Sequence, residues 1–404
     1  MPKICDIQSV YIFDGVRTVF GRRFGSLKRQ SAAELAATAV EGLLKRTKIS
    51  KNIINEVILG NVVSAGAGQN LARQVISRAG LLLKTTGYTV NTVCGAGLHA
   101  VALGAQSIML GESQVVLAGG TESASNNPSI TFKTSEQVLP DDFKDSLMTD
   151  GLTCAISGQK MGEIMEALVK KHGISRDRQD AFAIESHRKA YQAYQKRLET
   201  GEVIAVAAAR SRILDIDECI RKITSLPSLT SLPSAFLEKG TLTAGNSSVP
   251  CDGAAVVCLA GGETIRKYQW KPAARILGFA HIAVEPENTF EASIEAVKAC
   301  LRRTGVSLSS IDLFEIGEAF AAEALLIRDA LKIPDEKLNI WGGDLAVGHP
   351  LGAAGARILV TLIKALEDRR LKRGLCAIAY GGGGAVGMIV ENCRLDVPLF
   401  PKIK

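Results

Sequence analysis

The chain has 404 residues, of which 47% are hydrophobic, 5% aromatic and 22% charged, and its 48 basic and 41 acidic residues give a net charge of +7. This length suggests two or three domains, and the hydrophobic fraction excludes an intrinsically disordered protein. The positive excess is small and unpatterned, so it does not indicate a nucleic-acid-binding surface.

In the first part of the chain, predicted strands alternate with predicted helices. Strands are expected at 8–13, 56–63, 88–93 and 114–118, and helices at 32–46, 69–79 and 95–110. The first helix is expected to begin after Ser31, and the last strand is expected to end at Gly119-Gly120. This order predicts an α/β fold with buried, largely parallel strands.

The segment 121–249 breaks this alternation. It contains expected loops at 126–144, a charged helix at 177–197 and a stretch rich in Pro, Ser and Leu at 223–236. We therefore predict an inserted lobe, after which a buried strand returns at 251–260.

The second part of the chain weakly repeats the first. Strands are expected at 273–283, 313–316 and 376–380, helices at 289–304 and 319–331, and a glycine-rich turn at 342–357 that leads into a helix ending at residue 367. In each part a short apolar stretch meets a turn with one reactive side chain, Cys94 or His349, and the next strand ends in glycines. This predicts a duplicated half-fold with paired active-site turns.

The nine cysteines are irregularly spaced and form no CxxC pair. The pattern argues against both a disulfide framework and a zinc site, and it predicts reduced cysteines in a cytoplasmic protein without a metal. We identify no signal peptide, and no uninterrupted apolar run is long enough to cross a membrane.

Three segments carry candidate chemistry. Cys94 is expected where a strand turns into a helix, and the unpaired N–H groups and dipole of a helix start stabilise a thiolate. His349 is framed by glycine and proline at another helix start, as a base for Cys94 would be. Backbone N–H groups of Gly381–Gly384 could hold a developing oxyanion. The alternatives are a buried structural cysteine, a hydrogen-bonded turn histidine and a tightly packed turn.

Together these segments resemble the thiolase family, the acyl-CoA C-acyltransferases. The resemblance runs over nearly the whole chain and rests on the blocks at 10–18, 68–73, 87–98, 118–123, 176–182, 243–248, 315–320 and 348–357. It implies two similar βαβαβαββ halves in five α-β-α-β-α layers, with a loop domain inserted in the first half. The implied domains are residues 1–123 plus 250–272, 124–249 for the loop domain, and 273–404.

The resemblance also implies roles for individual residues. Cys94 matches the nucleophile, His349 the base that activates it, and the backbone N–H groups of Cys94 and Gly381 match an oxyanion hole. The positions that match coenzyme A contacts are Arg221, Ser228, Ser248, Ala319, Phe320 and Lys160, where Lys160 replaces the family's usual histidine. Coenzyme A or acyl-CoA is expected as a substrate, with no permanently bound cofactor.

Two departures from the family pattern concern carbon–carbon bond formation. The family's second catalytic cysteine falls on Ala379, and its oxyanion-hole Asn or His falls on Gly317. Cys376 lies three residues before Ala379 on the same strand, so it should face the opposite way. Trp341 replaces a small polar residue and would either reshape the acyl pocket or pack in the core.

These departures favour an acyltransferase that loads Cys94 from an acyl-CoA, with acetyl-CoA as the expected donor, but has weakened or absent Claisen condensation. The alternatives are a conventional acetyl-CoA acetyltransferase with a relocated acid/base, such as Tyr380, a partner or a water, and a non-catalytic coenzyme A-binding subunit. The resemblance further implies a homodimer or homotetramer and allows a second enzyme subunit as a partner, and neither nucleic acid nor a membrane is expected to bind.

Overall fold

The computed structural model describes residues 8–131, 143–208, 213–222 and 225–395. Its largest sheet follows the order β13-β14-β15-β12-β1-β11-β5-β3-β4. The strands of the first half are β1 (Val10–Thr18), β3 (Glu56–Gly60), β4 (Thr86–Val90), β5 (Val115–Ser123) and β11 (Cys251–Gly261). Those of the second half are β12 (Ala274–Ala283), β13 (Leu313–Ile316), β14 (Arg373–Tyr380) and β15 (Gly384–Asn392).

The two halves have the same strand order and directions. In the first half, β3 is parallel to β4 and β5, while β11 is antiparallel to β5 and β1. In the second half, β13 is parallel to β14, while β15 is antiparallel to β14 and β12. A parallel bridge from Phe314 to Leu338 takes the place of β4. The duplicated half-fold predicted from the sequence is therefore confirmed.

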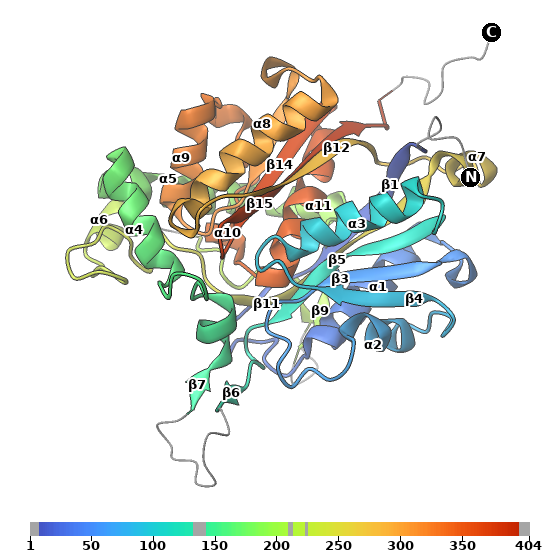
Figure 1. The fold of residues 1–404 in the computed structure, drawn as a ribbon, viewed down its shortest axis with the longest axis horizontal. Coiled ribbons are helices and arrows are strands. Elements are labelled where there is room, and N and C mark those ends of the chain that lie inside the picture. The colour runs from blue at the N-terminus through green and yellow to red at the C-terminus, as the bar shows by residue number, and fades with distance from the viewer. Residues whose placement is uncertain (1–7, 132–142, 209–212, 223–224, 396–404) are drawn as a thin grey trace.

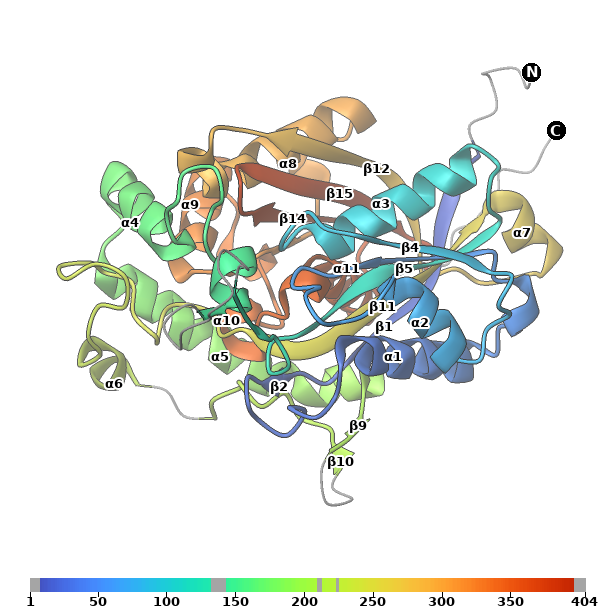
Figure 2. The ribbon, with the colours of Figure 1, turned by 60° about the horizontal axis from the view of Figure 1, so that its bottom comes forward.

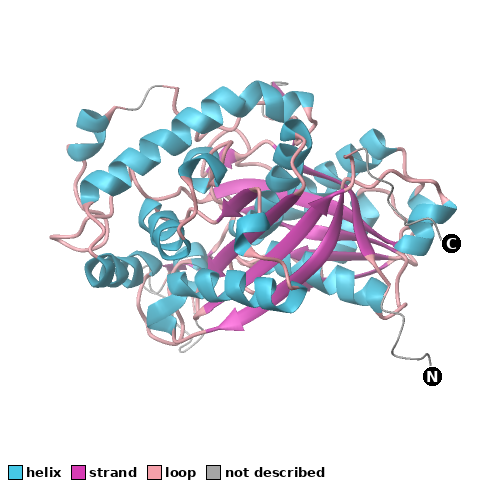
Figure 3. Cartoon of the chain, turned by 90° about the horizontal axis from the view of Figure 1, so that it is seen from above, coloured by secondary structure: helices cyan, strands magenta, loops and turns pink. Residues whose placement is uncertain are grey.

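The helices and the two half-sheets stack in five layers, in the order α-β-α-β-α (Figures 1 and 3). The outer helices of the first half are α1 (Ala32–Thr47) and α2 (Leu71–Arg78), and those of the second half are α8 (Ala292–Thr304) and α9 (Ala321–Leu331). Between the half-sheets lie α3 (Ala96–Met109) and α11 (Leu351–Arg369). Strand alternation matches this arrangement: in β5, Val115 and Leu117 pack with the α1 layer, and Val116 and Ala118 with the central helices.

Glycines let the two central helices approach closely. A Cβ atom on Gly97 would lie 2.7 Å from the carbonyl oxygen of Gly352, and one on Gly355 would lie 2.7 Å from the backbone nitrogen of Leu98. Larger residues would force α3 and α11 apart. Because Cys94 and His349 immediately precede these helices, the close crossing brings the two turns together.

Most of the predicted elements are present, and the local signals act as expected. Ser31 caps α1 and forms a capping box with Glu34. One expectation was wrong: β5 does not end at its glycine pair but continues to Ser123, paired residue by residue with β11. The glycine is needed there because a Cβ atom on Gly119 would lie 2.0 Å from the carbonyl oxygen of Ala255.

The elements that the sequence analysis missed include α4 (Met161–His172), α10 (Asp344–Val347) and β15. The charged helix α5 (Arg176–Glu199) was expected. The remaining short elements are β2 (Gly21–Arg22), β6 (Ser129–Ile130), β7 (Lys144–Asp145), β8 (Val203–Ile204), β9 (Val206–Ala207), β10 (Ile213–Leu214), α6 (Leu226–Thr230) and α7 (Gly262–Lys267). Figure 2 shows α4, α5 and α6 gathered at one side of the sheet.

Some expectations lie partly or wholly outside the described residues: both chain ends, part of the loop at 126–144 and part of the stretch at 223–236. The domain limits stay a prediction.

The cysteines among the described residues are free thiols. Across this described part, no cluster of His, Cys, Asp or Glu could hold a metal ion, and no helix has the length and apolar character needed to cross a membrane.

Candidate active site

A largely apolar cavity of about 200 Å³ lies where the two halves and the inserted segment meet. The central turns supply Cys94 and His349, and the end of β14 supplies Ala379, Tyr380 and Gly381. The other lining residues come mainly from the inserted segment and the start of α9: Met148, Leu152, Lys160, Met161, Gly162, Phe236, Ser247, Ser248, Pro250, Phe290, Ala319 and Phe320. Such a cavity suits a mostly apolar ligand that a few polar groups orient.

Cys94 occupies a tight turn between β4 and α3. Val93, directly before it, has φ 46°, a left-handed conformation that β-branched residues rarely adopt. The turn is closed by hydrogen bonds from the Gly95 nitrogen to the Thr92 oxygen and from the Ala96 nitrogen to the Val93 oxygen, both 3.0 Å. Strain of this kind is often found at functional sites. It leaves the half-buried Cys94 on the cavity wall at the start of a helix.

The backbone of His349 is hydrogen-bonded to the segment at the start of β11. Its nitrogen donates to the Val249 oxygen at 2.9 Å, and its oxygen accepts from the Cys251 nitrogen at 3.3 Å. Gly348, just before it, has φ 101°, and a Cβ atom there would lie 2.2 Å from the Cys251 sulfur. Glycine is therefore required beside His349, which is 4% exposed.

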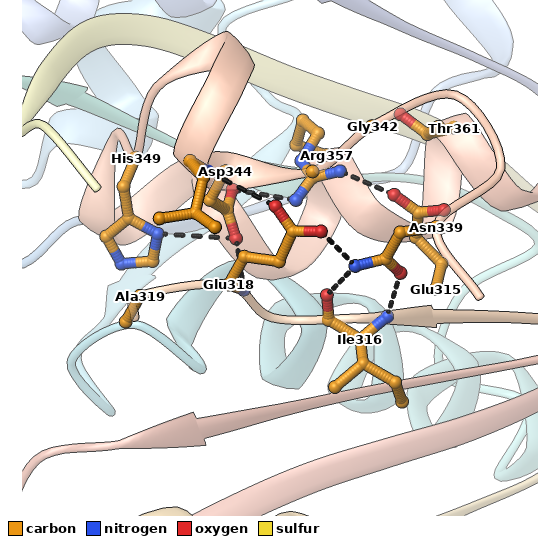
Figure 4. A network of polar contacts seen from close by, with 12 residues as sticks. Glu315, Ile316, Glu318, Ala319, Asn339, Gly342, Asp344, His349, Arg357 and Thr361 are labelled. Carbon is orange, nitrogen blue, oxygen red and sulfur yellow. Dashed lines mark hydrogen bonds and ion pairs between the residues drawn. The ribbon is translucent and has the colours of Figure 1, made fainter. Parts of the chain in front are cut away.

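The charge on His349 depends on two neighbouring groups. Burial lowers the pKa of His349, but the Cys94 sulfur and the Asp344 carboxylate raise it more, to about 10. Nδ1 of His349 lies 3.5 Å from Oδ2 of Asp344, an ion-pair contact at the outer limit of a hydrogen bond (Figure 4). The surroundings thus favour the imidazolium form beside the Cys94 sulfur.

Asp344, the ion-pair partner of His349, belongs to a buried polar network (Figure 4). Arg357 donates to Asp344 and to Glu315, at 2.7 Å each. Glu318 accepts from the Asn339 side chain at 2.7 Å. All five side chains are at most 2% exposed, so the network fixes the groups behind the cavity.

Glu323 is another fully buried carboxyl near His349. Its Oε2 accepts from the Ala319 nitrogen at 2.9 Å. Burial raises the pKa of Glu323 to about 8, while that hydrogen bond and the charge of His349 offset part of the increase. The protonated form is therefore favoured at neutral pH.

At the end of β14 the side chains alternate between the two faces of the strand. Ala379 packs with the outer layer and lines the cavity, while Cys376 packs with the central helices. Tyr380 also lines the cavity, and its hydroxyl lies 3.0 Å from Nε2 of His281. His281 stacks edge-on against His99, with ring centroids 4.1 Å apart.

The structure brings most of the sequence-predicted site residues together. Besides Cys94, His349 and Gly381, the cavity is lined by the predicted coenzyme A contacts Lys160, Ser248, Ala319 and Phe320. Arg221 and Ser228 are exposed and lie outside the lining.

Two other positions that depart from the family pattern, Gly317 and Trp341, do not line the cavity. Gly317 packs toward Ile378, where an added Cβ atom would find a carbon at 3.0 Å. Trp341 is 1% exposed and belongs to the central core, so of its two expected positions it takes the one in the core.

Sequence reasoning missed Asp344 and Glu323, which lie close to His349 in space. A carboxylate five residues before a candidate catalytic histidine, inside a glycine-rich turn, was the available signal for Asp344. Glu323 gave no such signal, since it lies on a different helix.

Comparisons with known proteins agree over most of the chain. The thiolase N-terminal domain model matches residues 10–263, and the thiolase C-terminal domain model matches residues 270–392. A Staphylococcus aureus (strain MRSA252) relative named "Probable acetyl-CoA acyltransferase" is 40% identical over 388 residues, covering 94% of this chain and 98% of the relative.

Two solved structures are similar as well. Human mitochondrial 3-ketoacyl-CoA thiolase in complex with CoA has 33% identity and a TM-score of 0.92, covering 96% of this chain and 98% of its own. The Bacillus anthracis acetyl-CoA acetyltransferase has 32% identity and a TM-score of 0.92, covering 96% and 99%.

Proposed function

The chain belongs to the thiolase family and is an acyltransferase, and we propose that it works as a conventional thiolase, with acetyl-CoA as a substrate and a thioester on Cys94 as the intermediate. The observation that carries this proposal is the position of Cys94 and His349. They come from corresponding turns of the two halves, and they line one cavity.

Before the proposed first step, the proton of the Cys94 thiol has moved to His349, which agrees with the imidazolium form that the site favours. The sulfur then attacks the carbonyl carbon of the acyl-CoA, a new thioester bond forms, and the coenzyme A sulfur leaves and takes the proton from His349. The negative oxygen formed in between would be held by the backbone N–H groups of Cys94 and Gly381, which both line the cavity.

The carbon–carbon step needs a second proton carrier at the substrate α-carbon. The Ala379 methyl group cannot serve, and among the described lining residues the other titratable side chains are Lys160 and Tyr380. We assign the step to Tyr380, because it lines the same cavity as Cys94 and its hydroxyl lies 3.0 Å from Nε2 of His281.

Weakened condensation, the main expectation from the sequence, becomes the second candidate. It is supported by Ala379 and Gly317, at which two side chains of the family's condensation machinery are replaced. The names of the similar proteins, an acetyl-CoA acyltransferase and two thiolase-type enzymes, favour the conventional activity instead.

Coenzyme A is proposed as a substrate rather than a resident cofactor. Its pantetheine arm would lie along the apolar wall that includes Ala319 and Phe320, with Lys160 and Ser248 as polar contacts. Arg221 and Ser228, on the exposed inserted segment, are proposed to contact its outer end.

A homodimer is proposed through the edge of the first half-sheet. In the described residues β4 pairs on one side only, with β3, and Tyr88 on it is 38% exposed. An unprotected edge strand of this kind can pair with its copy in a second chain. Analytical ultracentrifugation tests the dimer, and a monomer at micromolar concentration would refute it.

The test of function has two parts. After incubation with acetyl-CoA, we expect mass spectrometry to find one acetyl group on the peptide that contains Cys94, lost in Cys94→Ala and kept in the control Cys393→Ala. Thiolysis of acetoacetyl-CoA with coenzyme A then separates the two candidates. Acylation with thiolysis supports a conventional thiolase, and acylation without it supports the second candidate. An unmodified Cys94 would refute both.

A further inference from the structure

Asp344 is a buried carboxylate in contact with the ring of His349. Its Oδ2 is the ion-pair partner of His349 Nδ1 at 3.5 Å, so Nε2 is the ring nitrogen left for Cys94. The carboxylate is fully buried. We propose that Asp344 is a positioning residue that completes a Cys94–His349–Asp344 triad, by holding the proton of His349 on Nδ1 and stabilising the imidazolium that forms when Cys94 ionises. The inference deepens the proposed function and rests on it.

The carboxylate is fixed before any substrate arrives. Its Oδ1 accepts from Nη2 of Arg357 at 2.7 Å, and its Oδ2 accepts from the Glu318 backbone nitrogen at 3.1 Å. Arg357 is in turn held by Glu315 (Figure 4). A side chain anchored at both oxygens can orient its neighbour without moving.

The carboxylate also stays ionised. Burial raises the pKa of Asp344, but Arg357 and His349 lower it more, so it lies well below its usual range. The titratable groups facing His349 come from three elements: Cys94 before α3, Asp344 on α10 and Glu323 on α9. Glu323 favours its neutral form, so Asp344 supplies the negative charge behind the ring.

In the triad the proton moves only between sulfur and histidine. The Cys94 S–H proton goes to Nε2 of His349, whose Nδ1 already carries a proton facing Asp344. When the acyl group has reached the Cys94 sulfur, the same proton goes from Nε2 to the coenzyme A sulfur. Asp344 keeps its charge throughout and neither gains nor loses a proton.

Asp344→Asn tests the role, because it keeps the shape and removes the charge. We measure the rate at which iodoacetamide alkylates Cys94 as a function of pH, together with the rate of acetylation. The pH of half-maximal alkylation is expected to rise, and acetylation is expected to slow by roughly 10²- to 10⁴-fold. The matched control is Asp217→Asn, a buried carboxylate bonded to Arg17 away from the cavity, which should leave the alkylation profile unchanged.

A purely structural Asp344 predicts a different result. Thermal stability would then fall in both variants with no shift of the alkylation profile, and that outcome would overturn the triad. If Asp344→Asn does not fold, ¹⁵N NMR of His349 in the unmodified protein decides: a proton on Nδ1 supports the proposal, and neutral histidine protonated on Nε2 overturns it. Neither alkylation nor NMR uses acyl-CoA, so a protein that fails to acetylate Cys94 would refute the proposed function separately.

Discussion

Ala379 and Cys376 point to opposite faces of β14, Ala379 into the candidate active site and Cys376 into the central core. The thiol that the chain does have on this strand therefore cannot replace the one that the family pattern places at residue 379. Both faces of β14 are buried, so turning the strand over would exchange its two packed faces, and no local adjustment brings the Cys376 thiol to the cavity. The second proton carrier must therefore be a different group.

Tyr380→Phe tests whether that carrier is the tyrosine. The substitution removes only the hydroxyl and keeps the ring packed beside Gly95. We expect thiolysis of acetoacetyl-CoA to fall by roughly 10²- to 10⁴-fold, the usual effect of losing a general acid/base, while acetylation of Cys94 stays near its original rate. Stopped-flow thiolysis and mass spectrometry measure the two steps. Unchanged thiolysis would remove Tyr380 from the mechanism.

Adding Ala379→Cys to Tyr380→Phe should recover part of the lost thiolysis. The new thiol would lie on the cavity wall, where the Ala379 methyl group lies now. The matched control combines Cys376→Ala with Tyr380→Phe, and it should leave the thiolysis rate of Tyr380→Phe unchanged because Cys376 faces the core. Equal rates for the Ala379→Cys double variant and Tyr380→Phe alone would contradict the expectation.

The sequence was sufficient to predict the repeated architecture but not the groups behind the histidine. Ser31 marked the start of α1, and the turns at Cys94 and His349 marked two parts of the candidate cavity wall, because caps and turns are local signals. Asp344 meets Arg357 from α11 and Glu318 from the segment after β13. Contacts between distant segments leave no spacing in the sequence, so this network required the structure.

Trp341→Leu should reduce stability without changing acyl-chain preference. The indole is 1% exposed in the central core, and Arg197 lies 5.8 Å from its ring. We expect a loss of about 2–4 kcal/mol in the free energy of unfolding, as for other large-to-small core substitutions. The ratio of kcat/KM values for acetyl- and longer acyl-CoA substrates should stay constant. Leu152→Phe, which fills the cavity wall, is the contrasting variant and should disfavour longer chains.

Gly348→Ala should be among the most destabilising single changes near the site. It combines φ 101° with a Cβ position 2.2 Å from the Cys251 sulfur, so both strain and a clash contribute. We expect a loss of about 3–5 kcal/mol in the free energy of unfolding. Gly382→Ala separates the two effects, since Gly382 has φ 90° and open space around its Cβ position. Equal losses for the two variants would show that the clash contributes nothing.

Glu323→Gln should stabilise the protein increasingly as the pH rises. Because burial raises the pKa of Glu323 from 4.5 to about 8, the native state keeps a proton between these pH values that the unfolded state releases. The native state binds more protons there, so the carboxyl lowers stability as pH rises through this interval and adds no further change above it. The glutamine side chain is neutral at every pH and can still accept from the Ala319 nitrogen.

Urea unfolding at pH 5 and pH 8 measures this difference, with the unmodified chain as the reference. We expect the two proteins to differ little at pH 5 and the variant to be more stable by a few kcal/mol, on the order of 1–4, at pH 8. Glu295→Gln is the matched control: Glu295 is a partly exposed glutamate on α8 paired with Lys298, and the effect of replacing it should not depend on pH in this range. If the free energy of unfolding depended on pH in the same way for Glu323→Gln and the unmodified chain, Glu323 would be ionised in the folded protein. The negative charge near His349 would then come from both Glu323 and Asp344.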